Sequence, residues 1–128
     1  MTLTTVSITD DERSAIIAAV REYSETELAP FALERDEKAV FPIEALRHAG
    51  ELGLGGVYIS EDVGGTALSR VDAVSIFEEL AKGDPAIAAY LSIHNMVCWM
   101  IDTYGSEEQR RSWLPELVSM SALGAYFL

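Results

Sequence analysis

Side chains that could carry acid–base or metal chemistry are few in this sequence and lie far apart in it. The two histidines, His48 and His94, form neither a His-x-x-x-His nor a Glu-x-x-His pair, which are spacings that place two ligands on one helix face. Adjacent carboxylates such as those of Glu78-Glu79 point away from each other on a helix. We therefore expect no catalytic set and no metal site within this chain.

The apolar stretch from Pro85 to Tyr104 holds the remaining candidates. His94 could be a proton shuttle or ligand, or a hydrogen-bonded core histidine, and the second interpretation is favoured. Cys98 is the only cysteine, which excludes an internal disulfide, and its apolar surroundings favour a buried thiol over a reactive one. Tyr90, Ser92 and Met96 could line a pocket at a domain boundary, with ordinary core packing as the alternative.

Helix-start signals recur along the chain and predict the elements that position these side chains. Each signal places a capping oxygen just before an apolar-periodic stretch, followed by a polar partner three residues later or by a proline. The signals are Thr9 with Glu12, Ser69 with Asp72, Asp84 before Pro85, and Ser106 with Gln109. A proline at position 42 suits the start of a further helix, and residues 31–40 read as a short helical link. Pro30 should end the first helix near Leu28. The predicted fold is all-α, an orthogonal or up-down bundle of about six helices.

Apolar stripes at helical spacing predict which residues form the core. In the helix that follows Ser69, the charged residues Asp72, Glu79 and Lys82 are expected on the opposite, solvent-facing side. The expected core positions are Ile16, Val20 and Tyr23; Ile43, Leu46 and Leu52; Ala73, Val74, Phe77, Leu80 and Ala81; and Trp113, Leu114, Leu117 and Val118.

Two stretches depart from the helical pattern. Residues 53–65 contain five glycines around Val57-Tyr58-Ile59 and predict an ordered crossing loop, not a dinucleotide-binding motif, because no strand precedes it. Residues 122–128 form a short apolar, strand-like run with no partner strand elsewhere in the sequence. We therefore expect a helical domain over residues 1–120, with residues 121–128 beginning a β-domain that the sequence does not contain.

Charge limits the partners. Acidic residues outnumber basic ones by 21 to 9, for a net charge of −12, which repels nucleic acid and anionic membrane surfaces. The one basic doublet, Arg110-Arg111, is expected on a solvated helix face.

The longest uncharged run, residues 85–101, is too short and too polar for a bilayer, and the amino terminus lacks a signal-peptide pattern. These features predict a soluble, cytoplasmic protein. A hydrophobic content of 49% is high for one small domain and predicts an apolar face that meets other protein.

Two segments carry a resemblance to a known family. The stretch FPIEALRHAGELGLGGVYISEDVGG (residues 41–65) resembles the N-terminal domain of flavin-dependent acyl-CoA dehydrogenases, in which a helix runs into an acidic and then a Gly-Gly loop. YGSEEQRRSWLPELVSM (residues 104–120) is similar to a second segment of that domain. Within the family, AYLSIHNMVCWMI (residues 89–101) is most similar to the isobutyryl-CoA dehydrogenases, which act on short branched acyl chains.

The resemblance implies a larger enzyme of three domains that holds FAD and an acyl-CoA thioester between them. It implies that Tyr126 and Leu128 begin the flavin contact and that Ser92 and Met96 face the acyl tail. It also implies an electron-transfer flavoprotein as redox partner and assembly into a homo-oligomer. The catalytic glutamate and most flavin contacts of the family would lie beyond this sequence, so the chain alone is expected to be inactive and to bind no FAD. The alternative is a stand-alone helical module that grips a protein partner through its apolar face.

Overall fold

The computed structural model describes residues 5–127, and the regular structure within them is helical. Two 3₁₀ turns (Ala29–Phe31 and Glu61–Val63) and a π-helical turn (Ser24–Leu28) accompany the α-helices. The α-helices in this part of the chain are α1 (Asp10–Tyr23), α2 (Ala32–Lys38), α3 (Ile43–Glu51), α4 (Arg70–Gly83), α5 (Pro85–Tyr104) and α6 (Glu107–Val118). The predicted all-α class with about six helices is confirmed.

The helix starts lie where the capping signals place them. Thr9, Ser69 and Ser106 each form a capping box, in which the side-chain oxygen accepts from the N3 amide and the N3 side chain accepts from the cap amide. The carboxylate of Asp84 accepts from the first amides of α5, and Pro85 occupies the first turn. These caps depend only on residues within one turn, which is why the sequence alone predicts them.

The first helix ends in a distorted segment that brings it close to the end of α4. After Tyr23 the chain passes through the π-helical turn and then a 3₁₀ turn that contains Pro30. The hydroxyl of Ser24 donates to the carbonyl of Glu79 (2.8 Å). A Cβ on Gly83 would lie 2.4 Å from the Ser24 hydroxyl, so only glycine allows this approach. The predicted end near Leu28 is confirmed.

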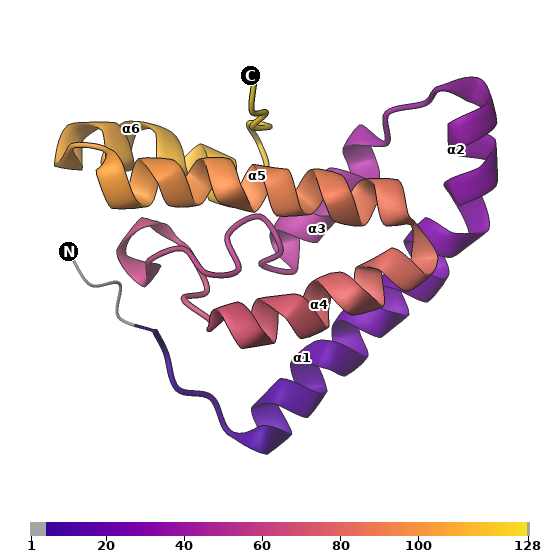
Figure 1. Ribbon diagram of the computed structural model, residues 1–128, viewed down its shortest axis with the longest axis horizontal. Helices are drawn as coiled ribbons and strands as arrows, with labels where there is room; N and C mark the ends of the chain where they lie inside the picture. Colours follow the sequence, from indigo (N-terminus) through magenta and orange to yellow (C-terminus); the bar gives the residue numbers. More distant parts are fainter. Residues whose placement is uncertain (1–4, 128) are drawn as a thin grey trace.

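Helices α4 and α5 form an antiparallel pair at the centre of the fold (Figure 1). Asp84 is the only residue between them, so the chain reverses direction there. On one side α1 packs against α4, and on the other α6 packs against α5. Helix α2 lies at an outer corner of the molecule and buries none of its residues (Figure 1).

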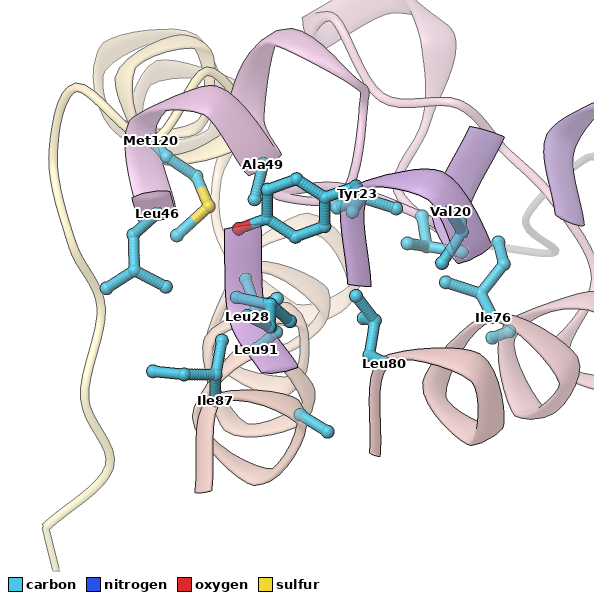
Figure 2. Close-up of a cluster of buried hydrophobic side chains, with 14 of the residues drawn as sticks. Val20, Tyr23, Leu28, Leu46, Ala49, Ile76, Leu80, Ile87, Leu91 and Met120 are labelled. Atoms are coloured by element: carbon cyan, nitrogen blue, oxygen red, sulfur yellow. The ribbon is translucent and has the colours of Figure 1, made fainter. Parts of the chain in front are cut away.

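The larger core cluster draws side chains from α1, α3, α4 and α5 (Figure 2). Tyr23 lies at its centre, and its hydroxyl donates to the carbonyl of Ala45 (2.6 Å), so the polar atom of this buried side chain is paired. A second cluster lies between α5, α6 and the loop of residues 53–65, with Ile59, Cys98 and Leu114 at its centre.

Burial differs from the sequence prediction at several positions. Ile43, Leu52, Val74 and Trp113 were expected in the core and are 44%, 41%, 66% and 54% exposed. Asp72 and Glu79 were expected on the solvent side and are 6% and 7% exposed. They face α1, where Arg13 pairs with Asp72 (2.6 Å) and Arg21 pairs with Glu79 (3.1 Å). These arginines are 59 and 58 residues away in sequence, so helical periodicity within α4 could not reveal them.

The loop of residues 53–65 is ordered and partly buried, as predicted. Val57 and Ile59 are 1% and 0% exposed, and a Cβ on Gly65 would lie 2.1 Å from the carbonyl oxygen of Ile59. Residues 123–127 have no regular secondary structure. Because a strand is defined by its hydrogen bonds to a partner strand, the predicted strand at 122–128 stays a prediction. Among residues 5–127, every helix is too short or too polar to cross a bilayer.

Candidate functional site

Helix α5 carries both residues that the resemblance assigns to the acyl tail. Ser92 and Met96 are one turn apart and half-buried. The hydroxyl of Ser92 donates to the carbonyl of Ala89 on its own helix (2.8 Å), so its polarity is already satisfied there. The surface that these two residues offer is therefore small and mostly apolar, which suits a hydrocarbon chain and supplies no acid or base.

Two other residues of α5 hold the chain segment that follows α6. The amide of Gly124 donates to Nδ1 of His94 (3.0 Å), and the hydroxyl of Tyr90 donates to the carbonyl of Gly124 (3.1 Å). Tyr90 and His94 are one turn apart, so they present these groups side by side. Gly124 is buried whereas residues 125–127 are exposed. This pair therefore marks the point where the chain leaves the surface of α5.

The hydrogen bonds of His94 assign its protonation state. Its Nε2 lies 2.8 Å from the carbonyl of Leu117, which can only accept, so Nε2 carries the proton. Its Nδ1 accepts from Gly124 and so carries none. The ring is completely buried, and this burial lowers the pKa of His94 despite the opposing effect of the Leu117 carbonyl. The prediction of a hydrogen-bonded core histidine is confirmed.

The next residues of α5 hold the loop of residues 53–65. The Oδ1 of Asn95 accepts from the amide of Val57 (2.7 Å), and its Nδ2 donates to the carbonyls of Leu54 (2.8 Å) and Leu91 (2.9 Å). The thiol of Cys98 faces the carbonyl of Gly55 (3.7 Å), and burial raises its pKa to about 12. A thiol that stays protonated at neutral pH is a poor nucleophile, so the prediction of an inert buried cysteine is confirmed.

A buried ion cluster fixes the far end of the same loop. Asp102 accepts from the amide and hydroxyl of Ser60 (3.0 and 2.7 Å) and pairs with Arg110 (2.7 Å). Arg110 also pairs with Asp62 (2.9 Å) and is 4% exposed, so the expected solvated doublet is wrong for Arg110. Its partner in the doublet, Arg111, has a side chain that is 77% exposed and fits the prediction. The hydrogen bonds that Arg110 donates to Asp62 and Asp102 raise the pKa of Arg110.

A cavity of about 320 Å³ lies beside Tyr90, between the start of α5 and the turn after α2. Phe41, Ile87 and Arg35 are among its lining residues, and the rings of Phe41 and Tyr90 meet edge to face with centroids 5.3 Å apart. The structure thus places Tyr90 at a cavity, as one of the two interpretations predicts. Ser92 and Met96 do not line this cavity.

The remaining predicted site residues lie at the carboxyl end. Tyr126 is 47% exposed and Phe127 is 97% exposed, directly after the anchored Gly124. Leu128 lies outside the described residues. The contacts of Tyr90 and His94 with Gly124 span 34 and 30 residues, so no local pattern in the sequence predicts them. Among residues 5–127, no group of three histidine, cysteine or carboxylate side chains could hold a metal ion.

Comparison with known proteins places this helical arrangement in a family. The family model described as "Acyl-CoA dehydrogenase, N-terminal domain" matches residues 10–121. The isobutyryl-CoA dehydrogenase of Dictyostelium discoideum is 45% identical over 123 residues, which are 96% of this chain and 29% of that protein. The isobutyryl-CoA dehydrogenase of Bos taurus is 48% identical over 106 residues, which are 83% of this chain and 26% of that protein.

A solved structure agrees. The glutaryl-CoA dehydrogenase of Mycobacterium smegmatis in complex with FADH2 matches with a TM-score of 0.83 and 30% identity, over 90% of this chain and 30% of that chain. The chain belongs to the acyl-CoA dehydrogenase family, whose N-terminal helical domain it represents. It spans less than a third of the length of each of these relatives.

Proposed function

We propose that this chain is the N-terminal helical domain of an FAD-dependent acyl-CoA dehydrogenase that oxidises a short, branched acyl-CoA such as isobutyryl-CoA. In this proposal the helical domain comprises residues 1–120, and residues 121–128 lead into a β-domain. The identity to two isobutyryl-CoA dehydrogenases over most of this chain is the observation that carries the proposal. In a complete protein, acyl-CoA is the substrate, an electron-transfer flavoprotein is the redox partner, and the assembly is a homo-oligomer.

The described residues suit the ring of a flavin better than its phosphates. The segment after Gly124 offers the half-exposed ring of Tyr126 and the fully exposed ring of Phe127, which are apolar contacts suited to a planar ring system. The net charge of −12 opposes the binding of a pyrophosphate by this domain alone. We therefore assign a ring contact to Tyr126, keep Leu128 as the second contact that the resemblance implies, and assign the phosphates to the rest of the protein. A bound FAD would supply the acceptor for the hydride from the β-carbon of the acyl chain.

The residues of this chain orient and shield the reactants and perform no proton transfer. Ser92 and Met96 on α5 line the acyl tail and exclude water from it, because neither presents an unsatisfied polar atom to an apolar chain. The only buried histidine of the described residues, His94, is engaged at both ring nitrogens. The resemblance to the family assigns the base that removes the α-proton to a glutamate outside this domain.

Flavin reduction by the substrate tests the proposal. The protein encoded by the complete reading frame should carry a visible flavin band that isobutyryl-CoA bleaches under anaerobic conditions faster than the unbranched butyryl-CoA does. The 128-residue chain alone should show neither band nor bleaching. If the complete protein carries no flavin, the proposed FAD-dependent oxidation is contradicted. If butyryl-CoA bleaches the flavin faster than isobutyryl-CoA does, the proposed preference for a branched substrate is contradicted.

The exposed apolar side chains support a second candidate, a helical module that binds a protein partner without catalysis. Within residues 5–127 the large exposed side chains include Leu33 (73%), Tyr104 (75%) and Phe127 (97%). The reading frame after Leu128 separates the two candidates. A continuation with Thr-Glu-Pro-Gly supports the dehydrogenase, and a natural stop codon supports the module.

A further inference from the structure

One glycine anchors the carboxyl-terminal segment to α5 through both of its backbone polar groups. Gly124 donates to His94 and accepts from Tyr90, at 3.0 and 3.1 Å. A Cβ at this position would lie 3.1 Å from Val97 and 3.4 Å from Nδ1 of His94, so the backbone lies close against the helix. The anchor lies two residues before Tyr126 and three before Phe127, which limits their distance from Gly124 to about 7 Å and about 10 Å in an extended chain.

We propose that Tyr90 and His94 are positioning residues that set where the flavin-contact segment, residues 125–127, lies relative to the acyl-facing residues Ser92 and Met96. The inference rests on the proposed function. All four of these side chains belong to one 20-residue helix, α5, so their spacing along the helix axis is fixed. Because Gly124 is hydrogen-bonded to that helix, the position of the residues that meet the flavin is set relative to Ser92 and Met96.

His94 has the more specific part of this arrangement. Its Nδ1 accepts from the buried amide of Gly124. Without an acceptor, that amide would stay desolvated and unpaired, which is destabilising. Its opposite nitrogen bonds to the Leu117 carbonyl at the end of α6, so the ring bridges α6 and the segment. Tyr90 is held from its other side by the ring of Phe41.

The two bonds of His94 can be separated by substitution. In His94→Asn the side-chain oxygen stands near the place of Nδ1, so the acceptor for Gly124 is kept and the donor to Leu117 is lost. In His94→Gln the amide nitrogen stands near the place of Nε2, so the donor to Leu117 is kept and the acceptor is lost. Each variant removes one hydrogen bond from the same buried site, which makes the two a matched pair for stability.

The first measurement is hydrogen exchange at the Gly124 amide of the full 128-residue chain, followed by NMR. Wild type and His94→Asn should protect this amide to the same degree within about twofold, and His94→Gln should lose about tenfold of that protection. Equal loss in both variants, or protection in His94→Gln equal to wild type, overturns the anchor.

The second measurement is FAD affinity and the flavin visible spectrum of the complete protein. His94→Gln should weaken FAD binding about tenfold and shift the flavin spectrum, while His94→Asn keeps both near wild type. A merely structural role of His94 predicts equal changes in both variants, in step with their melting temperatures. A wild-type protein that holds no FAD contradicts the proposed function and this inference together. A wild-type protein that holds FAD, with variants that behave alike, contradicts the inference alone.

Discussion

Asn95 shows how much a single buried polar side chain contributes when its oxygen and both of its N–H groups are hydrogen-bonded. It is completely buried and makes three hydrogen bonds, two of them to the loop of residues 53–65. Asn95→Ala leaves the amide of Val57 and the carbonyl of Leu54 without these partners, whereas the Leu91 carbonyl keeps its bond within the helix, and we expect a loss of about 2–3 kcal/mol in the free energy of unfolding. Urea denaturation followed by circular dichroism measures the loss.

Thr103, two turns further along α5, provides the control. Its hydroxyl oxygen is buried and has no hydrogen-bond partner. Thr103→Val keeps the shape and removes the unpaired polar atom, so the free energy of unfolding should stay level or rise by up to about 1 kcal/mol. If Thr103→Val lowered the free energy of unfolding as much as Asn95→Ala does, any substitution in this part of α5 would be destabilising, and the effect at Asn95 could not be attributed to its hydrogen bonds.

For single residues, the sequence predicts burial and chemical state better than it predicts hydrogen-bond partners. It predicted a buried, inert Cys98 and a hydrogen-bonded His94, because both lie in an apolar helical stretch. It could not predict their partners, since Gly55 and Gly124 are separated from them by 43 and 30 residues of chain. The assignments of Ser92, Met96, Tyr126 and Leu128 came from resemblance, and they stay predictions.

Between elements, close backbone contacts limit what the chain tolerates, and the contact of α3 with the end of α6 is the tightest example. A Cβ on Gly50 would lie 2.2 Å from the carbonyl oxygen of Ser119, which is backbone and cannot rotate away. We expect Gly50→Ala to lower the free energy of unfolding by about 1–3 kcal/mol, although alanine favours helix more than glycine does. The neighbouring exposed Glu51→Ala should have a small effect. A stabilising Gly50→Ala would contradict the packing described here.

Helices α1 and α4 are joined by ion pairs whose pH dependence can be predicted. Hydrogen bonds from Arg21, and then Lys82, lower the pKa of Glu79 from 4.5 to about 2, and Arg13 lowers the pKa of Asp72. The unfolded chain binds protons first, so this stabilisation is present above about pH 4.5 and is lost as the pH falls toward 2. Thermal unfolding between pH 7 and pH 2 should show a melting temperature that drops in this window.

A pair of variants tests the assignment to Glu79. Glu79→Gln should lower the melting temperature at pH 7 and flatten its dependence on pH between 4.5 and 2, since the titrating group is gone. Glu34→Gln removes a carboxylate from an exposed pair with Lys38, whose side chains are 60% and 65% exposed, and should change neither quantity. An unchanged pH profile in Glu79→Gln would contradict the assignment.

The elements also show what local sequence can and cannot specify. Capping at Thr9, Ser69 and Ser106 depends on residues three positions apart, and all three caps form as predicted. Burial depends on what packs against a helix, and there the prediction was wrong for Val74 and Trp113, which are apolar and exposed. Each lies on a helix whose opposite side contacts the core, so their exposure reflects the absence of a covering element within the described residues.

For the molecule as a whole, the exposed apolar surface predicts self-association of the isolated chain. Residues 31–43 hold five large hydrophobic side chains that are 44–73% exposed: Phe31, Leu33, Val40, Phe41 and Ile43. They run from the 3₁₀ turn before α2, through α2 at the outer corner of the molecule, to Ile43 at the start of α3 (Figure 1). A large exposed apolar surface is uncommon on monomers, so we expect a second copy to cover these side chains at high concentration.

Light scattering coupled to size exclusion tests this expectation over a range of chain concentrations. Leu33→Glu with Val40→Glu should shift the chain toward the monomer, because each charge would be buried without a partner in the complex. Val71→Glu with Val74→Glu changes two positions on α4 that are 77% and 66% exposed, against 73% and 51% for Leu33 and Val40, and should leave the association as in wild type. A monomeric wild-type chain at high concentration contradicts the expectation. An equal effect of both variant pairs shows that the association does not run through residues 31–43.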